Sequence, residues 1–161
     1  MKTQFDIQNL LDKGKIESEL ELERAFIAER KLKLLAKENS KYKATRKKLR
    51  DLIALYESDN WSENSKITPS QIRENDVAEL IAEKERAFIL SRKLLIKTKL
   101  KSYDLTQQQL GAILGHRSKS YMSELINGIS PFSLKDLIII NRLLKIDLSK
   151  LIPTILPQRD R

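Results

Sequence analysis

Residues 105–128, LTQQQLGAILGHRSKSYMSELING, combine a threonine-glutamine start with a second, serine-rich start whose side chains can hydrogen-bond to a polar surface. This stretch also holds three of the four glycines of the chain. Thr106 and either Ser118 or Ser120 can each begin a helix, because a side-chain oxygen there accepts from a free backbone N–H group. Gly115, between them, can adopt the left-handed conformation that ends a helix. The spacing predicts two short helices joined by a tight turn.

The second predicted helix divides into an apolar face and a polar face. Met122, Leu125 and Ile126 share the face that points inward. Small hydroxyls and a lysine on the other face permit close contact with a flat polar surface. A short helix in any small domain has polar residues outside, but two capped helices, a glycine turn and a final Asn-Gly form a more specific combination. The outward residues are Lys119, Ser120, Ser123, Glu124 and Asn127, with Tyr121 on the flank.

Neighbouring elements must support this helix pair, because about 20 residues cannot bury two apolar faces alone. Leu110, Ile113 and Leu114 are the predicted inward residues of the first helix. Gly111 costs about 1 kcal/mol in helix propensity, and the close approach of the second helix would explain it. Downstream, Ser133 can cap a helix whose inner face carries Leu137, Ile140, Asn141 and Leu144. Residues 146–152 then predict a short final helix before Pro153.

The upstream sequence predicts further helices. Apolar residues recur at three- and four-residue steps over 18–39 and again over 42–57, and residues 58–66 read as a loop. Thr68 followed by Pro69 has the form of a helix start. A long helix is expected from there to about residue 101, with an interruption near Asn75 and Asp76. Since glycine, proline and aromatic residues are sparse, the sequence predicts an all-α protein.

Composition excludes several classes of chemistry. The chain has no cysteine, so disulfides, thiolate catalysis and cysteine-ligated zinc are ruled out. The single histidine, His116, follows a glycine in the predicted turn, where we expect it to contact a phosphate or solvent. No catalytic constellation and no cofactor motif is visible, so an enzyme is not expected. Without a long apolar run or a secretory signal, we expect a cytoplasmic protein with no membrane partner.

The formal charge of +9 suggests a polyanionic partner, with nucleic acid as the first candidate. The surplus lies mostly upstream of the helix pair. Residues 41–50 carry six basic and no acidic side chains. The long helix is expected to expose a second basic group, whose surface is either solvated or faces phosphates or a partner. That group is Arg92, Lys93, Lys97, Lys99 and Lys101.

These residues resemble a known family. Residues 104–152 are similar to the lambda-repressor-like helix-turn-helix domain, and GHRSKSYMSELING followed by SL resembles the version in HigA antitoxins. The segment LRDLIALYESDNW, at 49–61, is similar to the helical region that precedes the domain in that family. The resemblance implies a domain of about five helices in a dimeric repressor. Such a repressor binds a palindromic operator in double-stranded DNA and neutralises a cognate mRNA-cleaving toxin.

The resemblance also implies which residues contact DNA. It places Gln107 near a phosphate at the start of the first helix. It places the beginning of the second helix at the DNA-facing edge, with its N-terminal residues against base edges. The family commonly has a basic pair after Asn-Gly, whereas Ile129, Ser130 and Pro131 follow here. The full candidate site is Thr106, Gln107, Arg117, Ser118, Lys119, Ser120, Tyr121, Ser123, Glu124 and Asn127.

The expected organisation has three parts. Residues 1–68 form an N-terminal helical region for dimerisation or toxin contact. Residues 69–152 form the DNA-binding domain with its long leading helix, and residues 153–161 form a tail. Two alternatives remain open: a stand-alone helix-turn-helix regulator, and a helical adaptor whose segments at 18–57 bind a protein.

Overall fold

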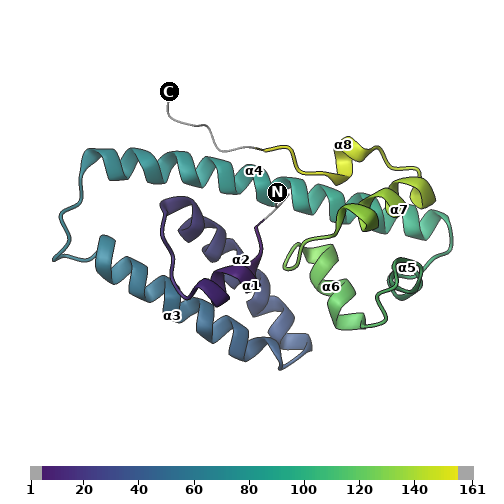
Figure 1. Ribbon diagram of the computed structural model, residues 1–161, viewed down its shortest axis with the longest axis horizontal. Helices are drawn as coiled ribbons and strands as arrows, with labels where there is room; N and C mark the ends of the chain where they lie inside the picture. Colours follow the sequence, from purple (N-terminus) through teal and green to yellow (C-terminus); the bar gives the residue numbers. More distant parts are fainter. Residues whose placement is uncertain (1–4, 156–161) are drawn as a thin grey trace. The chain divides into compact units, whose positions relative to one another are not determined.

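The computed structural model describes residues 5–155, which form eight α-helices and no strands (Figure 1). The predicted all-α class is confirmed. Backbone contacts divide the chain into two compact units, one over Asp6–Lys84 and one beginning at Glu85. We call them the upstream and the downstream unit. None of the described helices has the length and apolar character needed to cross a bilayer.

The upstream unit is built around a helical hairpin. It contains α1 (Ile7–Lys13), α2 (Glu19–Glu38), α3 (Tyr42–Asn60) and the first part of α4 (Pro69–Ser102). Ser18 caps α2 by accepting a hydrogen bond from the Glu21 N–H group at 3.1 Å. The core between α2 and α3 is apolar and includes Leu22, Ala25, Leu32, Leu49 and Ile53.

A buried carboxylate connects three segments of the upstream unit. Glu19 is only 2% exposed. Its Oε1 atom accepts from the Tyr56 hydroxyl at 2.9 Å and from the Trp61 indole N–H at 3.0 Å, and its Oε2 atom accepts from the Asn75 amide at 2.9 Å. Buried charges are tolerated when hydrogen bonds replace lost water. Glu19 therefore joins the start of α2 to α3, the following loop and α4.

The upstream helices differ from the prediction in three places. The helix α3 continues to Asn60, so the loop begins later than expected. The helix α4 is uninterrupted at Asn75 and Asp76. Asn75 bonds the Glu19 and Glu23 carboxylates, and its side chain therefore does not compete for the helix backbone. The helix α1 had no predicted counterpart, although Asp6 caps it by accepting from the Gln8 N–H group.

The downstream unit places a helix pair against three supporting helices. After the remainder of α4 come α5 (Gln107–Leu114), α6 (Lys119–Asn127), α7 (Leu134–Leu144) and α8 (Leu148–Leu151). All four match predicted helices. Their buried apolar side chains form one cluster with the end of α4. The members that are 0% exposed are Ile96, Leu110, Leu125, Ile140, Leu144 and Leu151.

Arg92, predicted to lie on the surface, is 1% exposed. Its guanidinium lies 5.1 Å from the Phe132 ring centre and 5.9 Å from that of Phe88, and its Nη1 atom donates to the Leu151 carbonyl at 3.1 Å. Burial lowers the pKa of Arg92 to about 10. The position is inward because the helical repeat places it on the face of Ile96, and its planar cation can stack on aromatic rings. Of the other cations in this group, Lys97 and Lys101 are exposed, whereas Lys93 and Lys99 are half-buried.

Candidate nucleic-acid interface

The first helix of the pair begins and ends as predicted. Thr106 Oγ1 accepts from the Gln109 N–H group at 3.1 Å, and Gln109 Oε1 accepts from the Thr106 N–H group at 2.8 Å. This reciprocal capping box satisfies two backbone donors that a helix start otherwise leaves free. Gly115 ends α5 in the left-handed region, with φ of +84°. Local sequence thus fixes the length of α5 at both ends.

The helices α5 and α6 pack closely at a glycine. A Cβ atom added to Gly111 would lie 2.6 Å from Met122 Cγ and 2.7 Å from the His116 carbonyl oxygen. Both distances are far below van der Waals contact, so the predicted reason for this glycine is confirmed. The prediction for Ile113 was wrong: this residue is 47% exposed, and the buried face of α5 consists of Leu110, Gly111 and Leu114.

The second helix presents its first turn to solvent. Ser118 Oγ accepts from the Tyr121 N–H group at 3.2 Å and caps α6. Met122, Leu125 and Ile126 are all at most 1% exposed, as predicted. On the other side of this turn, Ser120 is half-buried. The exposed residues there are Arg117, Ser118, Lys119 and Tyr121. Thr106, the cap of α5, is exposed, and Gln107, its first residue, is half-buried.

The C-terminal half of α6 uses its polar groups inside the protein. Asn127 Oδ1 accepts from Lys93 Nζ at 2.7 Å, and its amide donates to the Ser123 carbonyl at 2.8 Å. The Glu124 carboxylate accepts from the Ser130 hydroxyl at 3.1 Å. These three predicted site residues are half-buried. They hold the end of α6 against α4 and the following loop, which positions the first turn.

His116 occupies a different environment from the predicted one. Its Nε2 atom lies 3.0 and 3.1 Å from the two carboxylate oxygens of Asp136, and its ring meets the Tyr121 ring edge-on at 5.1 Å. Asp136 also accepts from the Ser133 N–H group at 3.2 Å, as part of the capping box of α7. The histidine therefore connects the turn to α7. The spacing Ser-x-x-Asp at 133–136 was the signal for this carboxylate.

The exposed turn of α6 has unneutralised positive charge. Neither Arg117 nor Lys119 forms an ion pair with any described residue. The hydroxyl of Ser118 lies between the two cations in sequence, and that of Ser120 follows Lys119. Cations and small donors at the start of a protruding helix match the acceptors of guanine and the phosphate oxygens beside the major groove of DNA.

Comparison with known proteins agrees with this geometry. No curated protein and no solved structure matches the chain. Residues 96–151, about a third of the chain, match a family model described as helix-turn-helix. The matched range begins in α4 and ends at the last residue of α8. The C-terminal part of this protein is therefore a helix-turn-helix domain, which supports a DNA-binding transcriptional regulator.

Proposed function

We propose that this protein is a sequence-specific DNA-binding antitoxin of the HigA type that represses its own operon. The observation that carries the DNA-binding part is the exposed first turn of α6. Lys119 in this turn and Arg117 just before its cap have no ion-pair partner among the described residues, and both lie within the matched helix-turn-helix domain. A helix in this position of such a domain enters the major groove with its N-terminal residues against the bases.

The proposed contacts follow from the chemistry of each side chain. Lys119 donates to guanine O6 or N7, while Arg117 pairs with a base edge or a phosphate. Ser118, Ser120 and Ser123 present hydroxyls that either donate or accept, and the Tyr121 ring lies against the backbone. Thr106 and Gln107 contact a phosphate at the start of α5. Glu124 and Asn127 complete the proposed site at the far end of α6, where Asn127 is anchored by Lys93.

The proposal includes a homodimer. Residues 102–150 contain six basic and four acidic side chains, a net charge of +2. A domain with so few surplus cations neutralises few phosphates and binds DNA weakly. Two copies related by a two-fold axis double the contacts. They would read a palindromic operator whose half-sites are about 34 Å apart, one helical turn of DNA.

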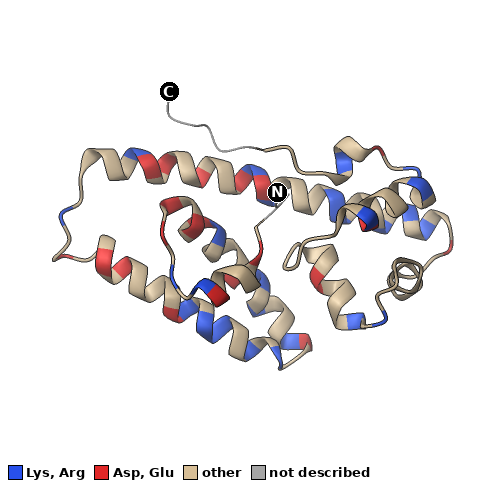
Figure 2. Ribbon diagram, viewed as in Figure 1, with Lys and Arg blue, Asp and Glu red and all other residues tan. Residues whose placement is uncertain are grey.

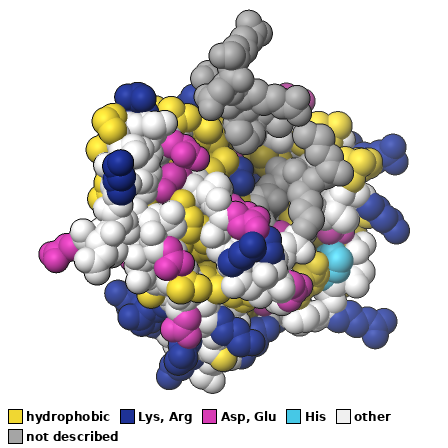
Figure 3. Space-filling view, turned by 60° about the vertical axis from the view of Figure 1, so that its left-hand side comes forward, with side chains coloured by type: hydrophobic (Ala, Val, Ile, Leu, Met, Phe, Trp, Pro, Cys, Tyr) yellow, Lys and Arg dark blue, Asp and Glu magenta, His cyan; other side chains and the backbone are white. Residues whose placement is uncertain are grey.

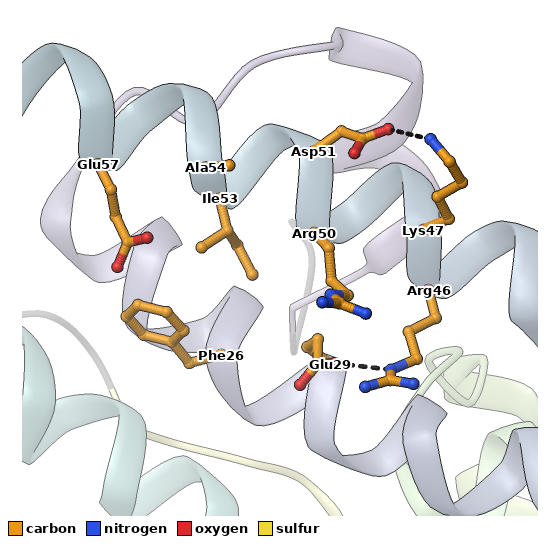
Figure 4. A pocket seen from close by; sticks show the side chains of 9 residues that line it. All are labelled: Phe26, Glu29, Arg46, Lys47, Arg50, Asp51, Ile53, Ala54 and Glu57. Carbon is orange, nitrogen blue, oxygen red and sulfur yellow. Dashed lines mark hydrogen bonds and ion pairs between the residues drawn. The ribbon is translucent and has the colours of Figure 1, made fainter.

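The upstream region is the proposed contact for a toxin or for the second copy. We assign this role to residues 1–68, DNA binding to 69–152 and a tail to 153–161. A groove of about 670 Å³ between α2 and α3 supports a protein partner (Figure 4). Its floor contains Phe26, Ile53 and Ala54, and an ion pair of 2.7 Å between Arg46 and Glu29 lies at one end. The same groove fits the helical adaptor as a second candidate function.

Two experiments test the parts separately. Selection from a library of randomised duplexes should recover a two-fold symmetric sequence that also lies upstream of the gene. Recovery of no preferred sequence would contradict the regulator. Co-expression with an adjacent small reading frame should restore growth and yield a co-purified complex. If the gene has no such neighbour, the antitoxin role is rejected and a stand-alone regulator is the remaining function. An adaptor without a DNA role would keep its partner at high salt and show no DNA preference.

A further inference from the structure

The densest positive charge of the chain lies on the first half of α3. Six basic residues and no acidic residue occupy positions 41–50. Figure 2 shows blue along this half of the helix and red along the other half. In the space-filling view, basic side chains gather along the lower edge, at the height of α3 in Figure 1 (Figure 3). The exposed members are Lys41, Lys43, Lys47, Lys48 and Arg50.

Only part of this charge is neutralised within the protein. Arg46 pairs with Glu29, and Lys47 pairs with Asp51 at 2.9 Å (Figure 4). Lys43, Lys48 and Arg50 form no ion pair with the described residues. We call these three residues the α3 basic surface. Arg50 extends from the helix toward the groove in Figure 4.

Lys43, in the first turn of α3, does not stabilise the helix that carries it. The beginning of a helix is the positive end of its dipole, where acidic side chains are favourable and basic ones are not. The helix α3 has no acidic residue in its first turn and no side-chain cap. Its stability comes from the opposite face, where Tyr42, Leu49 and Ile53 are buried. The charge of Lys43 therefore suits an external anion better than it suits the local fold.

We propose that the α3 basic surface binds phosphates of duplex DNA without regard to base sequence. This deepens the proposed function and rests on it, because the downstream domain supplies sequence recognition but little charge. From Lys43 to Arg50 the helix rises about 10 Å, at about 1.5 Å per residue. Phosphates follow one another at about 3.4 Å of axial rise along one DNA strand. Lys43 and Arg50 are seven residues, about two turns, apart and share one side of α3, so they can contact two phosphates of one strand that are about 10 Å apart. Lys48 lies about 140° further round the helix. DNA next to an operator provides such phosphates.

The test compares two charge-reversal variants of the full chain. One is Lys43→Glu with Lys48→Glu and Arg50→Glu. The matched control is Lys33→Glu with Lys66→Glu and Arg73→Glu, which changes the net charge equally at exposed positions of the upstream unit. Binding to a duplex of about 30 base pairs without an operator is followed by fluorescence anisotropy over a salt series. The α3 variant should bind at least about ten-fold more weakly at about 50 mM salt.

The salt dependence supplies the quantitative expectation. Each neutralised phosphate contributes about 0.9 to the slope of log affinity against log salt, so the α3 variant should lose about 1.8 from that slope through Lys43 and Arg50. The control should keep the parental slope. Equal losses in the two variants, or no loss in either, would overturn the proposal. A larger effect on double-stranded RNA than on DNA would overturn it in favour of RNA.

A further variant separates the role of the α3 basic surface from that of the reading helix α6. A second chain carries Lys119→Ala and Ser120→Ala, which should remove operator recognition. Adding the three α3 substitutions to this chain should lower its salt slope by the same amount. If the second chain still recognises the operator, the reading helix is wrong while the α3 result stands. If circular dichroism shows that the α3 variant is unfolded, a neutral variant takes its place. That variant carries Lys43→Gln, Lys48→Gln and Arg50→Gln. An unchanged slope in the neutral variant would overturn the proposal.

Discussion

Gly111 of α5 lies so close to Met122 of α6 that a single methyl group would reach within 2.6 Å of Met122 Cγ. The Met122 side chain therefore packs directly on the backbone of α5 at Gly111. Interiors as closely packed as this transmit changes of one carbon atom to neighbouring elements. The position of the reading helix depends on this contact and on the bond from Lys93 to Asn127 at its other end.

Gly111→Ala is expected to destabilise the downstream unit. Overpacking costs about 1–3 kcal/mol, and the improved helix propensity returns about 1 kcal/mol. The second close atom is the His116 backbone oxygen, which cannot move aside without shifting the turn. Thermal melting by circular dichroism measures the change. Gln108→Ala, at an exposed position of the same helix, is the control. A melting temperature at or above that of the parent would show that the pair has room to separate.

Gly128→Ala should lower the free energy of unfolding more than Gly115→Ala does. Both glycines have left-handed φ values, +74° and +84°, so an alanine suffers about 1–2 kcal/mol of backbone strain at either position. Only at Gly128 does the new methyl group also collide, because its Cβ would lie 2.6 Å from Ile89 Cγ2, whereas nothing lies within 4 Å at Gly115. Denaturant unfolding of the two variants measures the difference. Equal costs would mean that Ile89 moves aside freely.

Glu19→Gln should destabilise the upstream unit by about 2 kcal/mol, the order expected for hydrogen bonds to a buried charged group. An amide can accept through only one atom, so its NH₂ group would face either Asn75 or the pair of Tyr56 and Trp61. Trp61 is the only tryptophan, and its fluorescence during guanidinium unfolding reports the change. Glu23→Gln, which alters one bond to Asn75, should have a smaller effect. Equal effects would argue against a special role for Glu19.

High pH should weaken the upstream unit through Tyr56. Burial, and then the hydrogen bond to the Glu19 carboxylate, raises the pKa of Tyr56 above its ordinary value of 10.0. Between the unfolded and folded pKa values the folded chain holds the proton that the unfolded chain has lost, so the free energy of unfolding falls as pH rises above about 10. The free energy of unfolding of the Tyr56→Phe variant should fall less steeply over the same pH range. Urea unfolding from pH 8 to 11 compares the slopes, and parallel curves would contradict the assignment.

Local signals predicted the helix pair well. Thr106, Ser118 and Ser133 accept the cap hydrogen bonds, and Gly115 ends α5. These features depend on residues within one turn of each other, so they can be predicted from the sequence alone. The same is true of the inward face of α6, where three apolar residues recur at helical spacing.

Features set by distant partners were not predictable from local pattern. Arg92 reads as a surface residue because nothing near it in sequence shows that Phe132 and Leu151 surround it. His116 finds Asp136 twenty positions away. Asn127 lies on the polar side of α6, yet its oxygen is held by Lys93 from α4. Ile113 is exposed because α5 has only two turns and buries a single narrow stripe.

The most direct test is the affinity of Lys119→Ala with Ser120→Ala for the selected operator, measured by gel shift beside a duplex of scrambled sequence. The variant should keep its helical circular dichroism and lose its preference for the operator over the scrambled duplex. Charge-dependent binding to both duplexes should remain at low salt. A variant that still prefers the operator as strongly as the parent would show that the first turn of α6 does not read DNA.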